Sequence, residues 1–422
     1  MPALVVPASS IRSWFAVIAV MMGIFSIVTT EILPIGLLTP IGSDFGISAG
    51  TAGLMMTTPG VLAAFAAPAV TVATGRLDRR LMLCALMFLL AAADFLAAVA
   101  SHYWVMMVSR VLVGFVIGAF WSIGAGLAAR LVRPGHVGTA TAVIFSAVPL
   151  GSVLGVPAGT LLGELAGWRV AFVAMGVLTL SVLAALLVVL PPLPAQRVTS
   201  LKVLSGLLRA PAVRLGLVVT FLIVLAHFAT FTYVTPFLRQ VTQVSPGMIT
   251  VFLLVYGVAG IAGNFVAGTM VSRDVRATFI VSACLLATAT ALLPLVGRAE
   301  VGAIILLVLW GVAYGAVPVC SQTWFATSAP HAPEAATVVF TSSFQVSLSL
   351  GALGGGAVVD VTSPSTVMLL GAAAAILMAV TTRECSRRLL KGRPAVACPP
   401  GQLSEGGPGA PAEGEVVSVF AG

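Results

Sequence analysis

The sequence predicts an all-α membrane protein in which twelve transmembrane helices form two pseudo-symmetric bundles of six. Three observations lead to this prediction. Of the 422 residues, 59% are hydrophobic and 8% are charged, whereas a soluble domain is about 25% charged. Long uncharged segments recur along the whole chain, and the basic residues gather in alternate connections between them. Features of the first half also reappear, in the same order, in the second half.

Twelve apolar segments are each long enough to cross a hydrocarbon core of about 30 Å as a helix. They are separated by charges, prolines and glycines, and they cover 12–38, 50–74, 81–101, 103–131, 138–163, 168–191, 212–238, 247–271, 277–297, 300–326, 335–359 and 364–383. The first segment is longer than the apolar core of a signal peptide and has no small-residue cleavage site behind it. We therefore expect it to be retained as a membrane span.

The basic residues predict how these spans are oriented. When the N-terminus is placed in the cytoplasm, most of the 21 Lys and Arg residues lie on the cytoplasmic side. The opposite side holds Arg169, Arg239 and Arg298, while Arg110 lies within a span. Cytoplasmic connections of membrane proteins carry such an excess of positive charge. We expect a multi-pass protein of the cell membrane with both termini in the cytoplasm.

The connections divide the chain into four parts. A cytoplasmic linker at 192–211 separates an N-terminal six-helix bundle at 1–191 from a C-terminal bundle at 212–389. The tail at 390–422 is rich in Pro, Gly and Glu and has too little apolar content to fold, so we expect it to be disordered.

The repeat rests on three pairs of features. The stretch GRLDRR at 75–80 corresponds to GTMVSRDVR at 268–276. A Gly-x-x-x-Gly-Ala motif begins at Gly114 and again at Gly311, and Pro34 near the end of the first span has a counterpart at Pro236. Two homologous six-helix bundles with a site between them at the membrane midplane are a plan found among transporters.

These motifs resemble the major facilitator superfamily, and specifically its drug/proton antiporter group with twelve spans, over about residues 12–385. GRLDRR resembles the family's loop between spans two and three, and SRVLVGFVIGAFW at 109–121 resembles its motif on span four. GSVLGVPAGTLLGELAGWR at 151–169 resembles the antiporter motif of span five, although Val156 here separates the usual Gly-Pro pair. Further stretches resemble the purine-ribonucleoside efflux pumps, namely EILPIGLLTPIGSDFGIS, FTYVTPF and WGVAYGAVPVCSQTWF.

The resemblance implies a secondary active transporter that exports a small organic compound, such as a drug, a nucleoside or a related metabolite. Export would proceed by alternating access in exchange for protons. The alternative is a sugar or metabolite uniporter or importer on the same fold. A channel is disfavoured because the sequence has no filter-like loop. It is also one long chain with two unlike halves, and not a short subunit that would form a ring. An enzyme is disfavoured because the chain has four histidines and no catalytic cluster at a membrane boundary.

The sequence also indicates which binding partners to expect. The dispersed basic residues argue against nucleic acid, and the five cysteines show no paired or metal-ligating spacing. The chain has no Walker-type Gly-Lys-Ser/Thr loop, so ATP is not expected to drive it directly. We expect a monomer that works with protons, a small-molecule substrate and the lipid bilayer, and with no metal or cofactor.

Three charges within the spans are candidates for proton coupling. Glu31, Asp94 and Arg110 each lie about seven residues from the outer end of a span, which places all three about 10 Å deep. A buried charge needs a partner or a function. Protonation of a carboxylate that competes with the substrate would give antiport; the alternative is a static buried pair that orients helices. His227, in span seven, can also titrate, or can be a neutral ring bonded to a neighbour.

Substrate contacts are expected from cavity-facing polar and aromatic side chains on spans four, seven, ten and eleven. Planar rings can stack on a ring-containing substrate and amides can bond to its edge, whereas interfacial aromatics often only anchor a helix. The candidates are Trp121, Thr230, Tyr233, Trp310, Tyr314, Gln322, Ser343 and Gln345.

Two further motifs suggest moving contacts. Gly151, Gly155, Pro157 and Gly159 on span five are expected to pack closely against another helix, either at a rocking contact between the halves or in ordinary small-residue packing. Gly75, Asp78 and Arg79 are expected to form a latch between the halves at the cytoplasmic face, the alternative being a topology signal made of positive charge.

Overall fold

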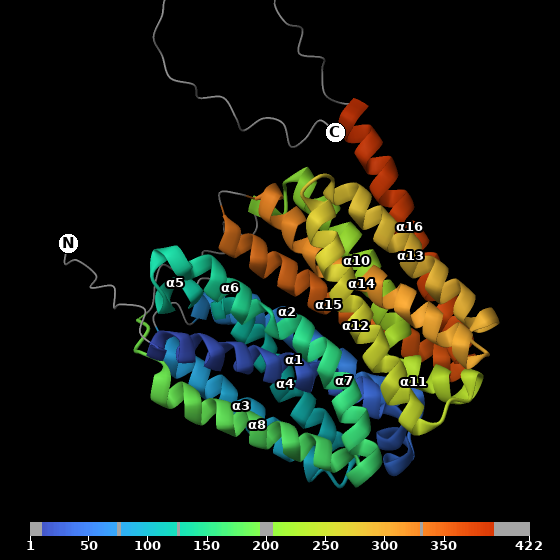
Figure 1. Ribbon diagram of the computed structural model, residues 1–422, viewed down its shortest axis with the longest axis horizontal. Helices are drawn as coiled ribbons and strands as arrows, with labels where there is room; N and C mark the ends of the chain where they lie inside the picture. The colour runs from blue at the N-terminus through green and yellow to red at the C-terminus, as the bar shows by residue number, and fades with distance from the viewer. Residues whose placement is uncertain (1–10, 74–76, 125–126, 195–205, 330–331, 392–422) are drawn as a thin grey trace, which may run out of the picture.

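The computed structural model describes residues 11–73, 77–124, 127–194, 206–329 and 332–391. In Figure 1 the helices of the first half, in blue and green, lie together at the lower left. The helices of the second half, in yellow-green to red, lie together at the upper right. Two predictions concern residues outside these ranges: Gly75 as part of the latch, and the disordered tail after Lys391.

The N-terminal half consists of long helices joined by short connections. In chain order its elements are α1 (Ile11–Phe45), α2 (Ala49–Ala73), α3 (Arg79–Ala98), α4 (Tyr103–Gly124), α5 (Leu127–Leu131), η1 (Pro134–His136), α6 (Val137–Phe145), α7 (Ala147–Ala166) and α8 (Trp168–Val189). Positive φ angles at Gly46 and Gly167 turn the chain after α1 and between α7 and α8, in a backbone region that favours glycine.

The C-terminal half follows the same plan. Its elements are α10 (Pro211–Phe231), α11 (Val234–Phe237), the π-helical turn η2 (Leu238–Thr242), α12 (Pro246–Val271), α13 (Val275–Val296), α14 (Glu300–Ser328), α15 (Pro333–Val361) and α16 (Pro364–Lys391). We call the end of the bundle where α1 begins the Arg12 end, and the end where α1 finishes the Asp44 end.

The structure confirms the predicted fold class. Within the described residues, twelve helices are long and apolar enough to cross a membrane. Large apolar side chains such as Phe65, Phe88 and Phe265 are exposed on the helices, as a lipid-facing surface requires. Several boundaries differ from the sequence prediction. The predicted span at 103–131 is divided between α4 and α5, the span at 138–163 is divided between α6 and α7, and the last helix runs on to Lys391. The first helix runs on to Phe45, and the predicted span at 212–238 is divided between α10, α11 and η2.

The internal repeat has a structural basis. Asp78 caps the third long helix of the first half by accepting a hydrogen bond from the Arg80 amide at 2.7 Å. Asp274 caps its counterpart α13 by accepting from the amides of Arg276 and Ala277. These caps supply acceptors for helix N-termini, which explains why an aspartate recurs at the two positions.

The repeated glycines also have matching roles. A methyl group at Gly114 would overlap the main chain of Pro59, so this glycine lets α4 approach α2. A methyl group at Gly311 would overlap the carbonyl oxygen of Tyr256, so this glycine lets α14 approach α12 in the other half. Each half therefore contains the same close helix pair.

The halves are joined mainly by two helix pairs, with smaller contacts between α1 and α11 and between α4 and α15. α2 packs against α15, and α7 packs against α12. The glycine face of α7 is turned elsewhere: Gly151, Gly155 and Gly159 lie against Val28, Thr29 and Leu33 of α1, within the same half. The contact of α7 with α12 is instead made by Val153 against Gly257. The glycine motif thus corresponds to close packing inside the N-terminal half, and the surface between the halves uses another face of α7.

Candidate functional site

The candidate site includes a main-chain carbonyl of α1, that of Thr30. Proline has no N–H, so Pro34 cannot donate the helical hydrogen bond that the carbonyl of Thr30 would otherwise accept. Arg110, which is fully buried on α4, donates to this oxygen through Nη1 at 3.0 Å. Its Nη2 donates to Ser109 Oγ at 3.3 Å, and its guanidinium lies 5.2 Å from the centre of the Phe172 ring. The arginine is therefore anchored to α1 at the point that the proline exposes.

Thr30 also contacts the buried acid of α3. Its hydroxyl donates to Asp94 Oδ2 at 3.2 Å, while Asp94 Oδ1 has no hydrogen-bond partner among the described residues. Thr30 thus joins Arg110 through its carbonyl and Asp94 through its side chain. All three side chains belong to the N-terminal half.

Glu31, the next residue along α1, faces the other half. Its Oε1 accepts a hydrogen bond from Gln345 Nε2 of α15 at 2.9 Å. Both side chains are buried, with 8% and 3% of their surface exposed. The Oε1 atom of Gln345 has no partner among the described residues. A carboxyl group and an amide therefore meet across the two halves in the core of the bundle.

The three charges predicted to lie at one depth are brought together, but not as direct ion pairs. Neither Glu31 nor Asp94 forms a salt bridge with Arg110; the ion pair seen in the described part of the chain joins Asp44 to Arg169. Thr30 lies between these groups instead: its carbonyl accepts from Nη1 of Arg110, and its hydroxyl donates to Asp94.

An aromatic group surrounds His227 in the C-terminal half. The His227 ring is parallel to the Tyr314 ring, with centroids 3.3 Å apart and planes 8° apart. It also stacks on Phe231, and Tyr256 stacks on Phe231 in turn. Trp310 Nε1 donates to His227 Nδ1 at 3.1 Å. Because an indole N–H can only donate, Nδ1 is the acceptor and the ring is a neutral imidazole with its hydrogen on Nε2.

The other substrate candidates lie in different surroundings. Thr230 donates to main-chain oxygens of its own helix, and Tyr233 donates to the carbonyl of Ala352 on α15. Gln322 is exposed, and the partly buried Trp121 packs against Phe120. Ser343 is partly buried, and its main-chain carbonyl accepts from Ser347. Of the eight candidates, Trp310 and Tyr314 join the aromatic group and Gln345 contacts Glu31.

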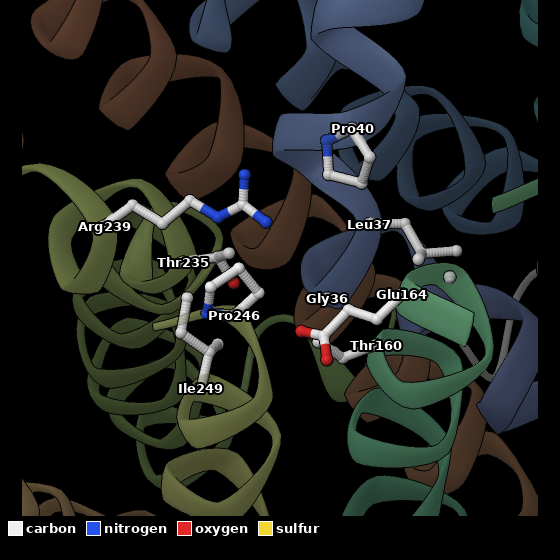
Figure 2. Close-up of a pocket in the computed structure, with 10 residues that line it drawn as sticks. Gly36, Leu37, Pro40, Thr160, Glu164, Thr235, Arg239, Pro246 and Ile249 are labelled. Carbon is white, nitrogen blue, oxygen red and sulfur yellow. The ribbon is translucent and has the colours of Figure 1, made fainter. Parts of the chain in front are cut away.

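A cavity of ≈ 290 Å³ lies between the halves toward the Asp44 end. Its lining residues are Gly36, Leu37, Pro40, Thr160, Gly163, Glu164, Thr235, Arg239, Pro246 and Ile249. In Figure 2 the carboxylate of Glu164 and the guanidinium of Arg239 extend toward it from opposite halves. Its residues on α1 begin at Gly36, so it lies beyond Glu31 along this helix.

The predicted latch residues are found at the Arg12 end. Besides capping α3, the carboxylate of Asp78 accepts a hydrogen bond from the Leu193 amide at 3.1 Å. The Arg79 amide donates to the Leu193 carbonyl at 2.8 Å. These contacts tie the start of α3 to the segment after α8, inside the N-terminal half. The function of Asp78 and Arg79 as a latch between halves stays a prediction.

The sequence interpretation missed two kinds of residue. Thr30 was overlooked because a main-chain carbonyl has no sequence signature of its own, although a proline four residues later is a usable signal. Phe231 and Tyr256 were overlooked because aromatic residues in apolar helices do not reveal which of them share a face. Glu31 and Gln345 were both predicted as functional residues, but the contact between them was not predicted.

In the described part of the chain, twelve helices long and apolar enough to cross a membrane form two matched halves that meet around buried polar groups, as in a multi-pass membrane protein of the transporter class. The family model of the Major Facilitator Superfamily matches residues 13–352, and the chain belongs to this family.

Solved structures agree with the fold. A bacterial homolog of the human lysosomal transporter Spinster, in an inward-facing and occupied conformation, matches with a TM-score of 0.72 and 15% identity over 91% of this chain and 98% of that one. A single-residue mutant of the nucleoside transporter NupG matches with a TM-score of 0.71 and 13% identity, over 87% of this chain and 99% of that one. The human organic anion transporter MFSD10 (TETRAN) matches with a TM-score of 0.66 and 18% identity, over 88% of this chain and 99% of that one. At these identities the likeness concerns the fold.

Proposed function

We propose that this protein exports a small organic compound across the cell membrane by alternating access, in exchange for protons, with Glu31 as the proton carrier. The observation that carries this proposal is the hydrogen bond from Gln345 to Glu31 across the two halves. It places the protonatable group of the N-terminal half in direct contact with a helix of the C-terminal half. A change in its protonation therefore acts on the contact between the halves.

The chemistry of the pair supports a coupling role. An ionised carboxylate only accepts hydrogen bonds, whereas a protonated one can also donate. The Oε1 atom of Gln345 has no partner in the described structure, so it is available to accept from a protonated Glu31. The acid and the amide can then form two hydrogen bonds in place of one. Protonation of Glu31 would strengthen the link between the halves, and loss of the proton would weaken it.

The aromatic group gives the substrate a surface to bind. Tyr314 is partly exposed, and its ring lies against the ring of His227. A substrate with a planar ring can stack on such a surface while a polar edge reaches Glu31 or Gln345. This arrangement favours a drug-like compound, a nucleoside or a related metabolite over a fully saturated one. Substrate and proton would then compete for Glu31, as antiport requires.

Orientation and assembly complete the proposal. The Arg12 end carries most of the Lys and Arg residues, so we place it, and both termini, in the cytoplasm. A monomer suffices, since each chain contains two halves and the surface between them.

The test uses purified protein in liposomes with an imposed pH gradient. A purine nucleoside and a cationic aromatic dye serve as probes, in wild type, Glu31→Gln and Gln345→Leu. We expect the gradient to drive uptake of a probe into the liposomes that contain wild-type protein. Glu31→Gln should abolish the effect of the gradient while retaining exchange of the probe, and Gln345→Leu should weaken it.

The matched control is Glu300→Gln, which makes the same chemical change in the exposed first turn of α14. This variant should retain the response of wild type. Transport in wild type that ignores the gradient would contradict proton exchange and favour a uniporter. Full coupling in Glu31→Gln would remove Glu31 as the carrier.

A further inference from the structure

The N-terminus of α2 is capped from the opposite half of the molecule. The first amides of a helix have no partner inside it. Ser48, the residue before α2, accepts from the Thr51 amide at 3.1 Å in the usual way. The Gly50 amide instead donates to Oδ1 of Asp360 at 2.8 Å, and the Ser48 hydroxyl donates to Oδ2 of the same carboxylate at 2.6 Å. Asp360 belongs to the last turn of α15, so we call this contact the Asp360 cap.

The packing around the Asp360 cap is close. A methyl group at Gly50 would overlap the carbonyl oxygen of Gly356 and the carboxylate of Asp360. A methyl group at Gly53, one turn further along α2, would overlap the hydroxyl of Tyr233. Gly50 lets the first turn of α2 reach α15, and Gly53 leaves room for Tyr233 of the same half as α15, so the cap forms only when the halves touch at this end. The contact therefore reports, and stabilises, one arrangement of the two halves.

We propose that Asp360 is a latch that holds the halves together at the Asp44 end, and that it releases α2 whenever this end opens. A carboxylate at a helix N-terminus is stabilised by hydrogen bonds and by the helix dipole. Asp360 is exposed, so water can replace its contacts when the halves separate. The latch accordingly biases the equilibrium between closed and open arrangements and does not lock it. This inference rests on the alternating access of the proposed function, but not on proton coupling or on any substrate.

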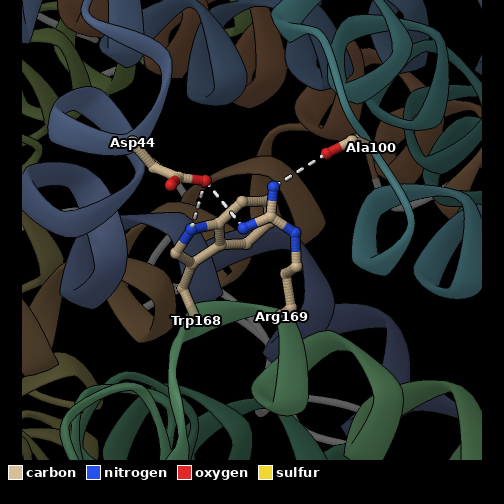
Figure 3. Close-up of polar contacts among 4 residues, drawn as sticks. All are labelled: Asp44, Ala100, Trp168 and Arg169. Atoms are coloured by element: carbon tan, nitrogen blue, oxygen red, sulfur yellow. Dashed lines mark hydrogen bonds and ion pairs between the residues drawn. The ribbon is translucent and has the colours of Figure 1, made fainter.

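A second carboxylate at the same end supplies the control. Asp44 forms an ion pair with Arg169 Nη1 at 2.7 Å and accepts from Trp168 Nε1 at 3.3 Å (Figure 3). Arg169 Nη2 also donates to the Ala100 carbonyl at 3.0 Å. All four residues lie in the N-terminal half. Loss of the Asp44 carboxylate therefore removes a charge from this end without altering a contact between the halves.

The experiment measures the separation of the halves directly. Spin labels are attached to cysteines at Val99 and Val301, which are 73% and 70% exposed near the Asp44 end of each half. The native cysteines are replaced by serine. Distance distributions are recorded by pulsed electron spin resonance for wild type, Asp360→Asn, Asp360→Ala, Ser48→Ala and Asp44→Asn, in lipid nanodiscs.

We expect Asp360→Ala to raise the ratio of long to short distances about fivefold, which corresponds to the loss of one helix cap. Asp360→Asn keeps one acceptor oxygen and should have a smaller effect of the same sign. Ser48→Ala removes one of the two bonds and should also lengthen the average distance. Asp44→Asn should match wild type.

The latch is contradicted if both Asp360 variants give the distribution of Asp44→Asn, or if no variant changes the distance at all. Asparagine is nearly the same size as aspartate, so the Asp360→Asn variant still tests the latch if the Asp360→Ala variant folds poorly. A failure of proton coupling in the liposome assay leaves the distance result unaffected, so the two proposals can fail separately.

Discussion

Arg110 donates to the carbonyl oxygen of Thr30, the oxygen that Pro34 leaves without a helical donor. This contact explains three features together. It gives a buried arginine an acceptor, it satisfies a main-chain oxygen in the core, and it fixes α4 against α1 beside Glu31. A charge in the membrane core is costly without such partners.

The first prediction concerns this contact. Arg110→Ala should lower the stability by about 1–3 kcal/mol, because it leaves the Thr30 carbonyl buried and unpaired. Pro34→Ala supplies an N–H at position 34 that can bond to the same oxygen. The double variant should therefore be more stable than Arg110→Ala alone. Thermal unfolding in detergent measures the difference, and Arg169→Ala, at the exposed ion pair, serves as the control. A double variant less stable than Arg110→Ala would contradict the assignment.

Asp94 should contribute little to coupling. Its hydrogen bond is to Thr30 of the same half, and among the described residues it forms none with the C-terminal half. Asp94→Asn retains an acceptor for the Thr30 hydroxyl, so we expect more than half of the gradient-driven transport to remain, while Glu31→Gln loses it. The measurement is transport at matched protein density over a series of imposed pH gradients. Loss of coupling in Asp94→Asn would make Asp94 a carrier beside Glu31.

His227 and Trp310 should behave as a hydrogen-bonded pair and not as a proton relay. His227→Phe leaves the Trp310 N–H without its acceptor, and Trp310→Phe leaves Nδ1 of His227 without its donor. Each single change should cost about 1–3 kcal/mol, whereas the double change to two phenylalanines should cost less than the sum. The unfolding midpoints of wild type, the two single variants and the double variant complete the double-mutant cycle. Proton coupling should persist in His227→Phe, and its disappearance would assign a titrating function to this residue.

The sequence predicted the features that depend on one helix at a time. The number of spans follows from length and apolarity, and the common depth of Glu31 and Arg110 follows from the constant rise of a helix. Contacts between helices depend on the rotation and register of each one, which no single segment determines. For this reason the sequence contained the signals for Glu31 and Gln345 separately but not their pairing. The glycines of α7 were identified as packing residues, but whether they face α1 or the other half depends on the rotation of that helix.

The repeat allows the function of Asp78 to be separated from capping. Asp78 and Asp274 both cap a helix, so Asp78→Ala and Asp274→Ala should each cost about 1 kcal/mol of stability for the lost cap, and Asp78→Ala also loses the bond from the Leu193 amide. If Asp78 is also a latch, its replacement should reduce the transport rate severalfold at equal stability, whereas Asp274→Ala should not. The two variants are compared in unfolding and in liposome transport. Equal transport in both would contradict a latch at Asp78, because its replacement would then affect only the helix cap and the Leu193 contact inside the N-terminal half.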